Sequence, residues 1–162
     1  MENSKRVRPD ETSEQREIRR KRVVEEWAKV GLTLNDVYGS TGGKLGNSFD
    51  AQRLIFIARS QGKEDACIEA IYKANHEEGK CLSDLETLLA AAASAGLVGA
   101  REALASGEGI NEVAEKIASY HKMGLNSVPV VIINEMYVLQ GYPQPELLEV
   151  AFAQLIEQGT LG

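Results

Sequence analysis

The chain has 162 residues, of which 43% are hydrophobic and 26% are charged, and this is typical of one globular domain. Its two cysteines, Cys67 and Cys81, are too few for a disulfide scaffold or for a zinc site made of four thiolates. The formal net charge of −6 argues against a surface that coats nucleic acid, so we expect no nucleic-acid partner. The sequence predicts no metal and no cofactor.

Basic residues concentrate near the N-terminus, with five of them between residues 16 and 22. Glutamates lie within and beside this run, at Glu14, Glu17, Glu25 and Glu26. Because helices of mixed charge usually present a solvated, ion-paired face, we interpret the run in that way. No stretch of 18 apolar residues predicts a membrane span, and the first residues lack the apolar core of a secretory signal. We therefore expect no membrane association and a cytoplasmic location.

Hydrophobic spacing predicts that most of the chain before residue 125 is helical. Residues 1–11 are expected to be a flexible lead-in, and the glycine-rich stretch 31–47 a loop. The predicted apolar stripes of the helices lie within residues 12–30, 51–58, 67–74, 85–92, 99–105 and 110–117. The predicted capping residues are Thr12 with Gln15, Ser48, and Ser83 with Glu86.

The hydrophobic period changes at Val128, where residues 128–133 form a short apolar run that is β-branched except at its proline. Asn134-Glu135 predicts a turn, and residues 136–140 predict a returning strand, so a β-hairpin is expected. Because the first run is apolar on both faces, we expect it to be buried inside a covered sheet. Pro145 then predicts the start of a closing helix.

Two segments in this order resemble one known family. Residues 42–55, which contain Asn47 and Arg53, resemble the segment that opens the helical insertion of DsbA-like oxidoreductases of the FrnE type. The unit from Ser127 to the closing helix resembles the second half of a thioredoxin fold. The resemblance covers roughly residues 5–158, and 2-hydroxychromene-2-carboxylate isomerases and kappa-class glutathione transferases share the same plan.

This resemblance implies an α/β, mostly helical fold. A DsbA-like helical region would cover residues 12–125, and the C-terminal ββα half of a thioredoxin fold would cover residues 126–162. The Val128-Pro129 bond would be cis, as X-Pro bonds alone commonly are. In the family, the backbone before this proline pairs with a bound substrate as an added strand.

The resemblance also implies substrate contacts by two polar residues of the first segment. Asn47 and Arg53 correspond to a region that borders the substrate cleft in the isomerase relatives. Asn47 could equally be a loop or capping residue, and both readings remain open. The implied substrate is a thiol, a peptide or a small molecule.

The active site that this family uses is missing from the sequence. DsbA-like enzymes work through a Cys-x-x-Cys at a helix N-terminus, where the helix dipole lowers the pKa of the first thiol. The chain contains no Cys-x-x-Cys. We therefore expect that the N-terminal strand, the active-site helix and the second strand are absent, which leaves the thioredoxin fold incomplete.

The two cysteines do not replace that motif. If residues 64–78 form a helix, Cys67 lies about 18 Å from residue 79. A disulfide needs Cα atoms within about 7 Å, so Cys67 cannot reach Cys81 without breaking the helix. We expect Cys67 to be a packed structural thiol.

Three functions remain as alternatives. The chain could be a thiol–disulfide oxidoreductase family member that is inactive alone or complemented by a partner segment that supplies the thiols. It could instead be a non-redox binding or scaffold protein, or a thiol-independent isomerase that uses Asn47 and Arg53. In each case the strand near Val130–Ile133 would have an open edge, so we expect a homodimer or a partner segment there.

Overall fold

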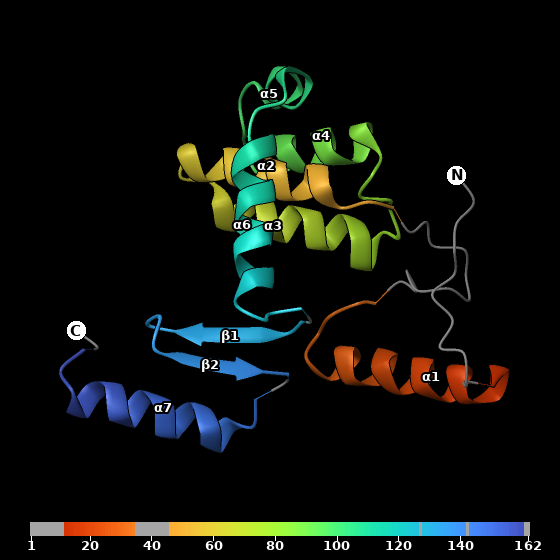
Figure 1. Cartoon of the computed structure of the whole chain (residues 1–162). Coiled ribbons are helices and arrows are strands. Elements are labelled where there is room, and N and C mark those ends of the chain that lie inside the picture. The colour runs from red at the N-terminus through yellow and green to blue at the C-terminus, as the bar shows by residue number, and fades with distance from the viewer. Residues whose placement is uncertain (1–11, 35–45, 127, 142, 161–162) are drawn as a thin grey trace. The chain divides into compact units, whose positions relative to one another are not determined.

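A computed structural model describes residues 12–34, 46–126, 128–141 and 143–160. The elements follow in chain order as α1 (Ser13–Lys29), α2 (Phe49–Ser60), α3 (Glu64–Tyr72), η1 (Lys73–Glu77), α4 (Leu85–Ser94), α5 (Ala100–Ser106), α6 (Ile110–Lys122), β1 (Val130–Ile133), β2 (Tyr137–Gln140) and α7 (Pro145–Glu157) (Figure 1). Within the described ranges, no helix is both long enough and apolar enough to cross a membrane.

The chain divides into two compact units, residues 1–113 and residues 114–162. The division falls within α6, whereas the sequence placed a domain boundary after residue 125. The predicted lead-in over residues 1–11 lies outside the described residues. The same is true of most of the predicted loop, because residues 35–45 are not described.

Helix α1 begins as its sequence predicts. The Thr12 hydroxyl accepts a hydrogen bond from the Gln15 N–H at 3.2 Å, and the Gln15 side chain accepts one from the Thr12 N–H at 2.9 Å. This reciprocal arrangement satisfies two of the donors that a helix N-terminus leaves free. Arg20 pairs with Glu17 at 3.2 Å on the same helix, as an ion-paired face requires. The predicted capping box is confirmed.

The core of the first unit lies among α2, α3, α4 and α5 (Figure 1). Its largest fully buried side chains are Leu54, Leu88 and Cys67. Burial of a leucine side chain stabilises a fold by roughly 1.5–3 kcal/mol. Ala91 and Ala92 of α4 are buried in the same cluster, and small side chains at these positions allow close approach of neighbouring helices. The predicted packing of Cys67 as a structural thiol is confirmed.

The predicted capping box at the start of α4 is wrong by one residue. Asp84, and not Ser83, occupies the N-cap position, and its carboxylate accepts a hydrogen bond from the Thr87 N–H at 3.0 Å. The Ser83 hydroxyl lies instead 3.1 Å from the thiol of Cys81. Aspartate and serine are both strong N-cap residues, so the sequence pattern alone could not choose between these adjacent positions.

Helix α3 continues into one π-helical turn, η1, that the hydrophobic pattern did not predict. The apolar stripe reaches Ala74, which is buried, so the turn keeps the same face toward the core. A π turn inserts one residue into the helical repeat and rotates the residues that follow it. It therefore changes the direction in which His76 projects, and this matters for the aromatic cluster described below.

In the second unit, β1 and β2 pair antiparallel, with Val131 opposite Leu139 and Ile133 opposite Tyr137. These four side chains form a hydrophobic cluster with the buried Ala151 and Leu155 of α7. Pro145 occupies the start of α7, as predicted. Figure 1 shows α7 running along the hairpin.

The opposite face of the hairpin differs from the expectation. Ile132 and Val138 are opposite one another in the register and both are exposed. Within the described residues the sheet has two strands, so β1 is covered on its α7 face only. The prediction that both faces of this strand are buried is therefore not met. An apolar run indicates that a strand can be buried, but it does not identify the element that covers it.

The hairpin turn carries a strained residue, and its replacement is a first prediction. Asn134 and Glu135 have φ values of 50° and 57°, and Met136 N–H donates to the carbonyl of Ile133 at 3.0 Å. Glycine adopts this left-handed conformation freely, whereas glutamate does so at a cost of about 1–2 kcal/mol. Glu135→Gly is therefore expected to raise the free energy of unfolding by about 1 kcal/mol, measured by urea denaturation. Glu135→Ala keeps the strain and should give no such gain.

Candidate functional site

The candidate site begins where the chain enters β1. The peptide bond between Val128 and Pro129 is cis. Val128 is 92% exposed, and the carbonyl of Pro129 accepts a hydrogen bond from Gly141 N–H at 2.9 Å. This bond extends the ladder with β2 by one pair beyond the strands, so the proline is held at the end of the sheet. Proline has no N–H to donate to the ladder, so within a sheet it is restricted to positions such as this one at the start of a strand.

The hydrogen-bond pattern shows which main-chain groups of β1 face away from β2. Pro129 and Gly141 form a hydrogen-bonded pair, and such pairs alternate along an antiparallel ladder. Val131 therefore directs its N–H and C=O toward β2, while Val130 and Ile132 direct theirs toward the other edge. Within the part of the chain that the structure describes, no strand pairs with that edge. The outward groups can bind an extended polypeptide.

Asn47 lies in the first unit and caps a helix. Its side-chain oxygen accepts a hydrogen bond from the Phe49 N–H at 2.9 Å. Ser48, which the sequence predicted as the cap of α2, occupies the N-cap position but makes no side-chain cap hydrogen bond. Of the two readings of Asn47, the structure therefore shows the capping one, and the predicted substrate contact stays a prediction.

Arg53 is a buried cation that joins two helices of the first unit. Its guanidinium donates to the carbonyls of Glu108 at 2.9 Å and Leu104 at 3.0 Å, and it pairs with the Asp50 carboxylate at 2.7 Å. The carbonyl groups at the C-terminus of α5 lack intrahelical partners, and the guanidinium supplies donors to them. Arg53 thus has a structural function. Its predicted contact with a substrate stays a prediction.

The two cysteines are both free thiols, as the helical geometry predicted. Burial raises the pKa of the Cys67 thiol to about 11, so it is protonated at neutral pH. Cys81 is half-buried beside Ser83. Gly46 packs on this pair so closely that an added Cβ would lie 2.6 Å from the sulfur of Cys81. Cys67 lies within α3, and Cys81 lies in the segment between η1 and α4.

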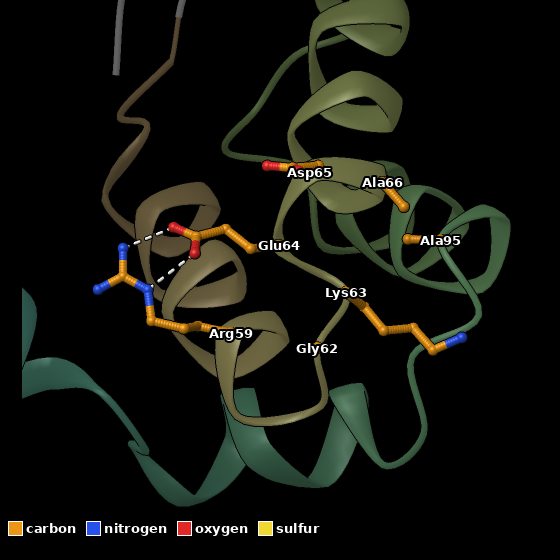
Figure 2. Close-up of a pocket in the computed structure, with 7 residues that line it drawn as sticks. All are labelled: Arg59, Gly62, Lys63, Glu64, Asp65, Ala66 and Ala95. Atoms are coloured by element: carbon orange, nitrogen blue, oxygen red, sulfur yellow. Dashed lines mark hydrogen bonds and ion pairs between the residues drawn. The ribbon is translucent and has the colours of Figure 1, made fainter. Parts of the chain in front are cut away.

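A hollow on the first unit offers no chemistry of its own. It is open to solvent between the end of α2 and the start of α3 (Figure 2). Arg59 donates two hydrogen bonds to the carboxylate of Glu64, at 2.9 and 2.5 Å, and this contact lowers the pKa of Glu64. The pair lies at the surface, and each side chain compensates the charge of the other. Among the described residues, no group of three or more His, Cys, Asp or Glu side chains could hold a metal ion.

Comparison with known proteins decides the family. A sequence model of the DSBA-like thioredoxin domain matches residues 4–153. The chain belongs to the DsbA-like thioredoxin domain family. A search of curated proteins found no match.

A solved structure supports the same fold. The crystal structure of a probable DsbA oxidoreductase from Streptomyces coelicolor superimposes with a TM-score of 0.78 at 24% sequence identity. The similarity covers 89% of this chain and 62% of that protein, so the chain spans less than two thirds of its length. The predicted α/β, mostly helical DsbA-like fold is therefore confirmed.

One cluster of aromatic side chains in this DsbA-like chain was not predicted from the sequence. The imidazole of His76 lies 5.4 Å from the ring of Trp27 and 5.7 Å from that of Tyr72, measured between ring centroids. The cluster joins α1 to the π turn η1. No spacing pattern could have indicated it, because Trp27 and His76 are far apart in sequence and the π turn determines the direction of the imidazole.

This cluster predicts a pH dependence of stability. Burial lowers the pKa of His76 from its ordinary value of 6.5, so the folded state favours the neutral imidazole. The unfolded chain then binds more protons, and stability present above pH 6.5 is lost as the pH falls through the lowered folded-state pKa. Trp27 is the one tryptophan in the sequence, so its fluorescence should report the same titration. His76→Phe should flatten both curves, whereas His121→Gln, at an exposed site, should change neither.

Proposed function

We propose that this chain is a FrnE-type DsbA-like protein that binds an extended thiol or peptide substrate at the Val128-Pro129 end of β1. We further propose that it carries out no disulfide exchange with its own cysteines. The observation that carries the proposal is the outward edge of β1 beside the exposed Val128, with which no strand pairs among the described residues of this DsbA-like fold. Any thiol chemistry would require a pair of thiols from a partner segment.

The binding part of the proposal rests on the main chain of β1. An extended peptide can add a strand to an exposed edge, where backbone hydrogen bonds supply affinity and do not depend on the peptide sequence. Val130 provides one outward N–H and one outward C=O beside Pro129. The exposed side chain of Val128 adds apolar contact area at the same place.

The redox part of the proposal rests on the cysteines. In disulfide exchange, a thiolate attacks a disulfide sulfur, forms a mixed disulfide and releases the other sulfur as a thiolate. A second thiolate then attacks the mixed disulfide and releases the remaining substrate sulfur. Cys67 is buried and protonated, and the pair cannot act together because Cys67 and Cys81 are separated by helix α3 and η1. Both thiols of the exchange would therefore come from the partner, and this chain would hold the substrate.

A second candidate, a non-redox binding protein, is favoured by the same burial of Cys67. It differs from the first in needing no thiol at any step. The isomerase alternative depends on substrate contacts by Asn47 and Arg53. Both side chains already make hydrogen bonds within the first unit, so this alternative has the least support of the three.

Two measurements test the proposal. The chain alone is expected to show no turnover in insulin reduction with dithiothreitol, and Ellman's reagent should modify Cys81 before Cys67, which reacts only on unfolding. A reduced cysteine-containing peptide should shift the amide NMR signal of Val130 but not that of Val138 on the far strand. Insulin turnover that Cys81→Ser abolishes would contradict the redox part, and a peptide that shifts neither amide would contradict the binding part. Equal binding of a peptide without cysteine would favour the non-redox candidate.

A further inference from the structure

We propose that Arg53 is a positioning residue for α6. By holding the short connection between α5 and α6, residues 107–109, it fixes the direction in which α6 leaves the first unit. We call residues 107–109 the joint. This inference does not rest on the proposed function, because it concerns contacts within the first unit and the backbone of one helix.

The joint contains two glycines in the left-handed conformation. Gly107 has a φ of 84° and Gly109 has a φ of 77°. Glycine has no Cβ, so its backbone is less restricted than that of any other residue. Short connections of this kind can absorb the backbone rotations by which one part of a protein turns against another. The direction of α6 therefore depends on the contacts that hold the joint.

The main-chain hydrogen bonds of the joint are local. The Glu108 N–H donates to the carbonyl of Ala103 at 3.1 Å, and the Ile110 N–H donates to that of Gly107 at 3.2 Å. Both bonds join residues that are close in sequence, as at other helix ends. They tie the joint to α5 and to the first residue of α6. A contact from another helix is needed to hold the joint against the core of the first unit.

Arg53 of α2 makes that contact. Its Nε donates to the carbonyl of Glu108, in the joint, at 2.9 Å, and its Nη2 donates to the carbonyl of Leu104, in α5, at 3.0 Å. The guanidinium is planar and its donors have a fixed geometry, so the two carbonyls are held in a fixed relation. The Glu108 carbonyl belongs to the peptide plane shared with Gly109, and this plane has to rotate if α6 is to turn. Because Arg53 is 4% exposed, water has little access to these hydrogen bonds.

The ring of Phe56 contacts the joint at a second point. Phe56 follows Arg53 by three positions in α2, so both side chains project from the same side of the helix. The position of an added Cβ at Gly109 lies 2.9 Å from Cδ1 of Phe56, so the ring lies directly against Gly109. A polar contact at Glu108 and an apolar contact at Gly109 thus hold neighbouring residues of the joint against α2.

Helix α6 carries the direction of the joint into the second unit. The helix has 13 residues and is about 20 Å long. The chain passes from the first unit to the second within it, after Val113. A continuous helix bends little over this length, so a turn of about 20° at the joint would move the far end by about 7 Å. Arg53 therefore has an effect on the second unit that requires no contact with a substrate.

Distances between spin labels on the two units, measured by pulsed electron paramagnetic resonance of the full chain, test the proposal. The labels are attached to Ala90→Cys in α4 and Glu149→Cys in α7, which are exposed sites, in a Cys81→Ser background. We expect one narrow distance distribution. Arg53→Met should broaden this distribution by up to about 7 Å, for a swing of about 20°. Arg59→Met, the same substitution at an exposed site of α2, should leave it unchanged.

A label pair within the first unit shows whether its core remains intact. Ala90→Cys with Glu69→Cys in α3 should keep its distance in every variant, and the buried Cys67 should not be labelled. Circular dichroism shows whether each variant is folded. Arg53→Lys keeps the charge without the planar fork, and it replaces Arg53→Met if that variant does not fold. A purely structural function of Arg53 would change stability or the distance within the first unit, but not the distance between the units of folded molecules.

Gly109→Ala tests the joint without a change at Arg53. Its new methyl group displaces the ring of Phe56, so the mean distance between the units should shift. Gly62→Ala, where no atom lies within 4 Å of the added Cβ, should cause no shift. A broad distribution with Arg53 in place, an unchanged distribution in the folded Arg53 variant, equal broadening in Arg59→Met, or a folded Gly109→Ala variant without a shift would each overturn the proposal.

Discussion

Replacing Arg53 by methionine is expected to lower the free energy of unfolding by about 2–4 kcal/mol, one of the two largest effects predicted for this chain. The residue is 4% exposed, and its guanidinium contacts the carbonyls of Leu104 and Glu108 and the carboxylate of Asp50. Methionine retains the length of the aliphatic stem but none of the donors. Urea denaturation followed by circular dichroism measures the change.

The loss arises from groups that are left without partners. A buried carbonyl that loses its donor costs roughly 1–3 kcal/mol. Arg53 donates to the carbonyl of Leu104 in α5 and to that of Glu108 just after it, and the Leu104 carbonyl keeps a longer hydrogen bond, of 3.4 Å, from the Gly107 N–H. Asp50 is more than half exposed and can be hydrated by water, so its share is small. The α2–α5 contact should therefore account for most of the effect.

Two comparisons isolate this cause. Arg59→Met makes the same substitution on the same helix, but Arg59 is 67% exposed and pairs with Glu64 at the surface, so only a small fraction of the loss is expected. Arg53→Lys keeps the charge but cannot reach several acceptors together, and it should give an intermediate loss. If Arg53→Met and Arg59→Met were equally stable, the structural function of Arg53 would be wrong.

The regular elements of this fold could be predicted from the sequence because their information is local. The apolar spacing of α2, α4 and α6, the Thr12–Gln15 capping box, the proline at the start of α7 and the β-branched run of β1 all involve neighbouring residues. Each of these signals depends on backbone geometry that repeats over a few residues. The structure has all of these elements at the predicted places.

The features that were missed depend on residues far apart in the chain. The contact from Arg53 to the Glu108 carbonyl spans 55 residues, and the π turn that directs His76 toward Trp27 gives no hydrophobic signature. The cover of β1 is another such feature, because an apolar face does not identify its neighbour. A motif position therefore indicated that Arg53 was important, but only the fold shows what the guanidinium contacts.

The candidate site was predictable in part. The cis bond at Val128-Pro129 followed from the family resemblance, and the structure has it. The separation of Cys67 from Cys81 followed from spacing, since a helical segment lies between them. Asn47 and Arg53 lie in the first unit and Val128 and Pro129 in the second, and a substrate contact by any of the four stays a prediction.

The other large effect is expected at Gly109, which precedes α6. Gly109 has a φ of +77°, a left-handed conformation that costs other residues about 1–2 kcal/mol. A Cβ added there would lie 2.9 Å from Cδ1 of Phe56, too close for carbon atoms in contact. Overpacking of this kind typically costs a further 1–3 kcal/mol, so Gly109→Ala should lower the free energy of unfolding by about 2–5 kcal/mol.

Gly62 separates the two causes of that loss. Its φ is +65°, but no atom lies within 4 Å of the position of an added Cβ, so Gly62→Ala should show the backbone cost alone. Phe56→Leu removes the ring edge that the new methyl group meets, and in that background Gly109→Ala should cost about as much as Gly62→Ala. Double-mutant cycles from urea denaturation measure this coupling. Additive losses would show that Phe56 does not limit the space at Gly109, and that the backbone conformation alone requires glycine there.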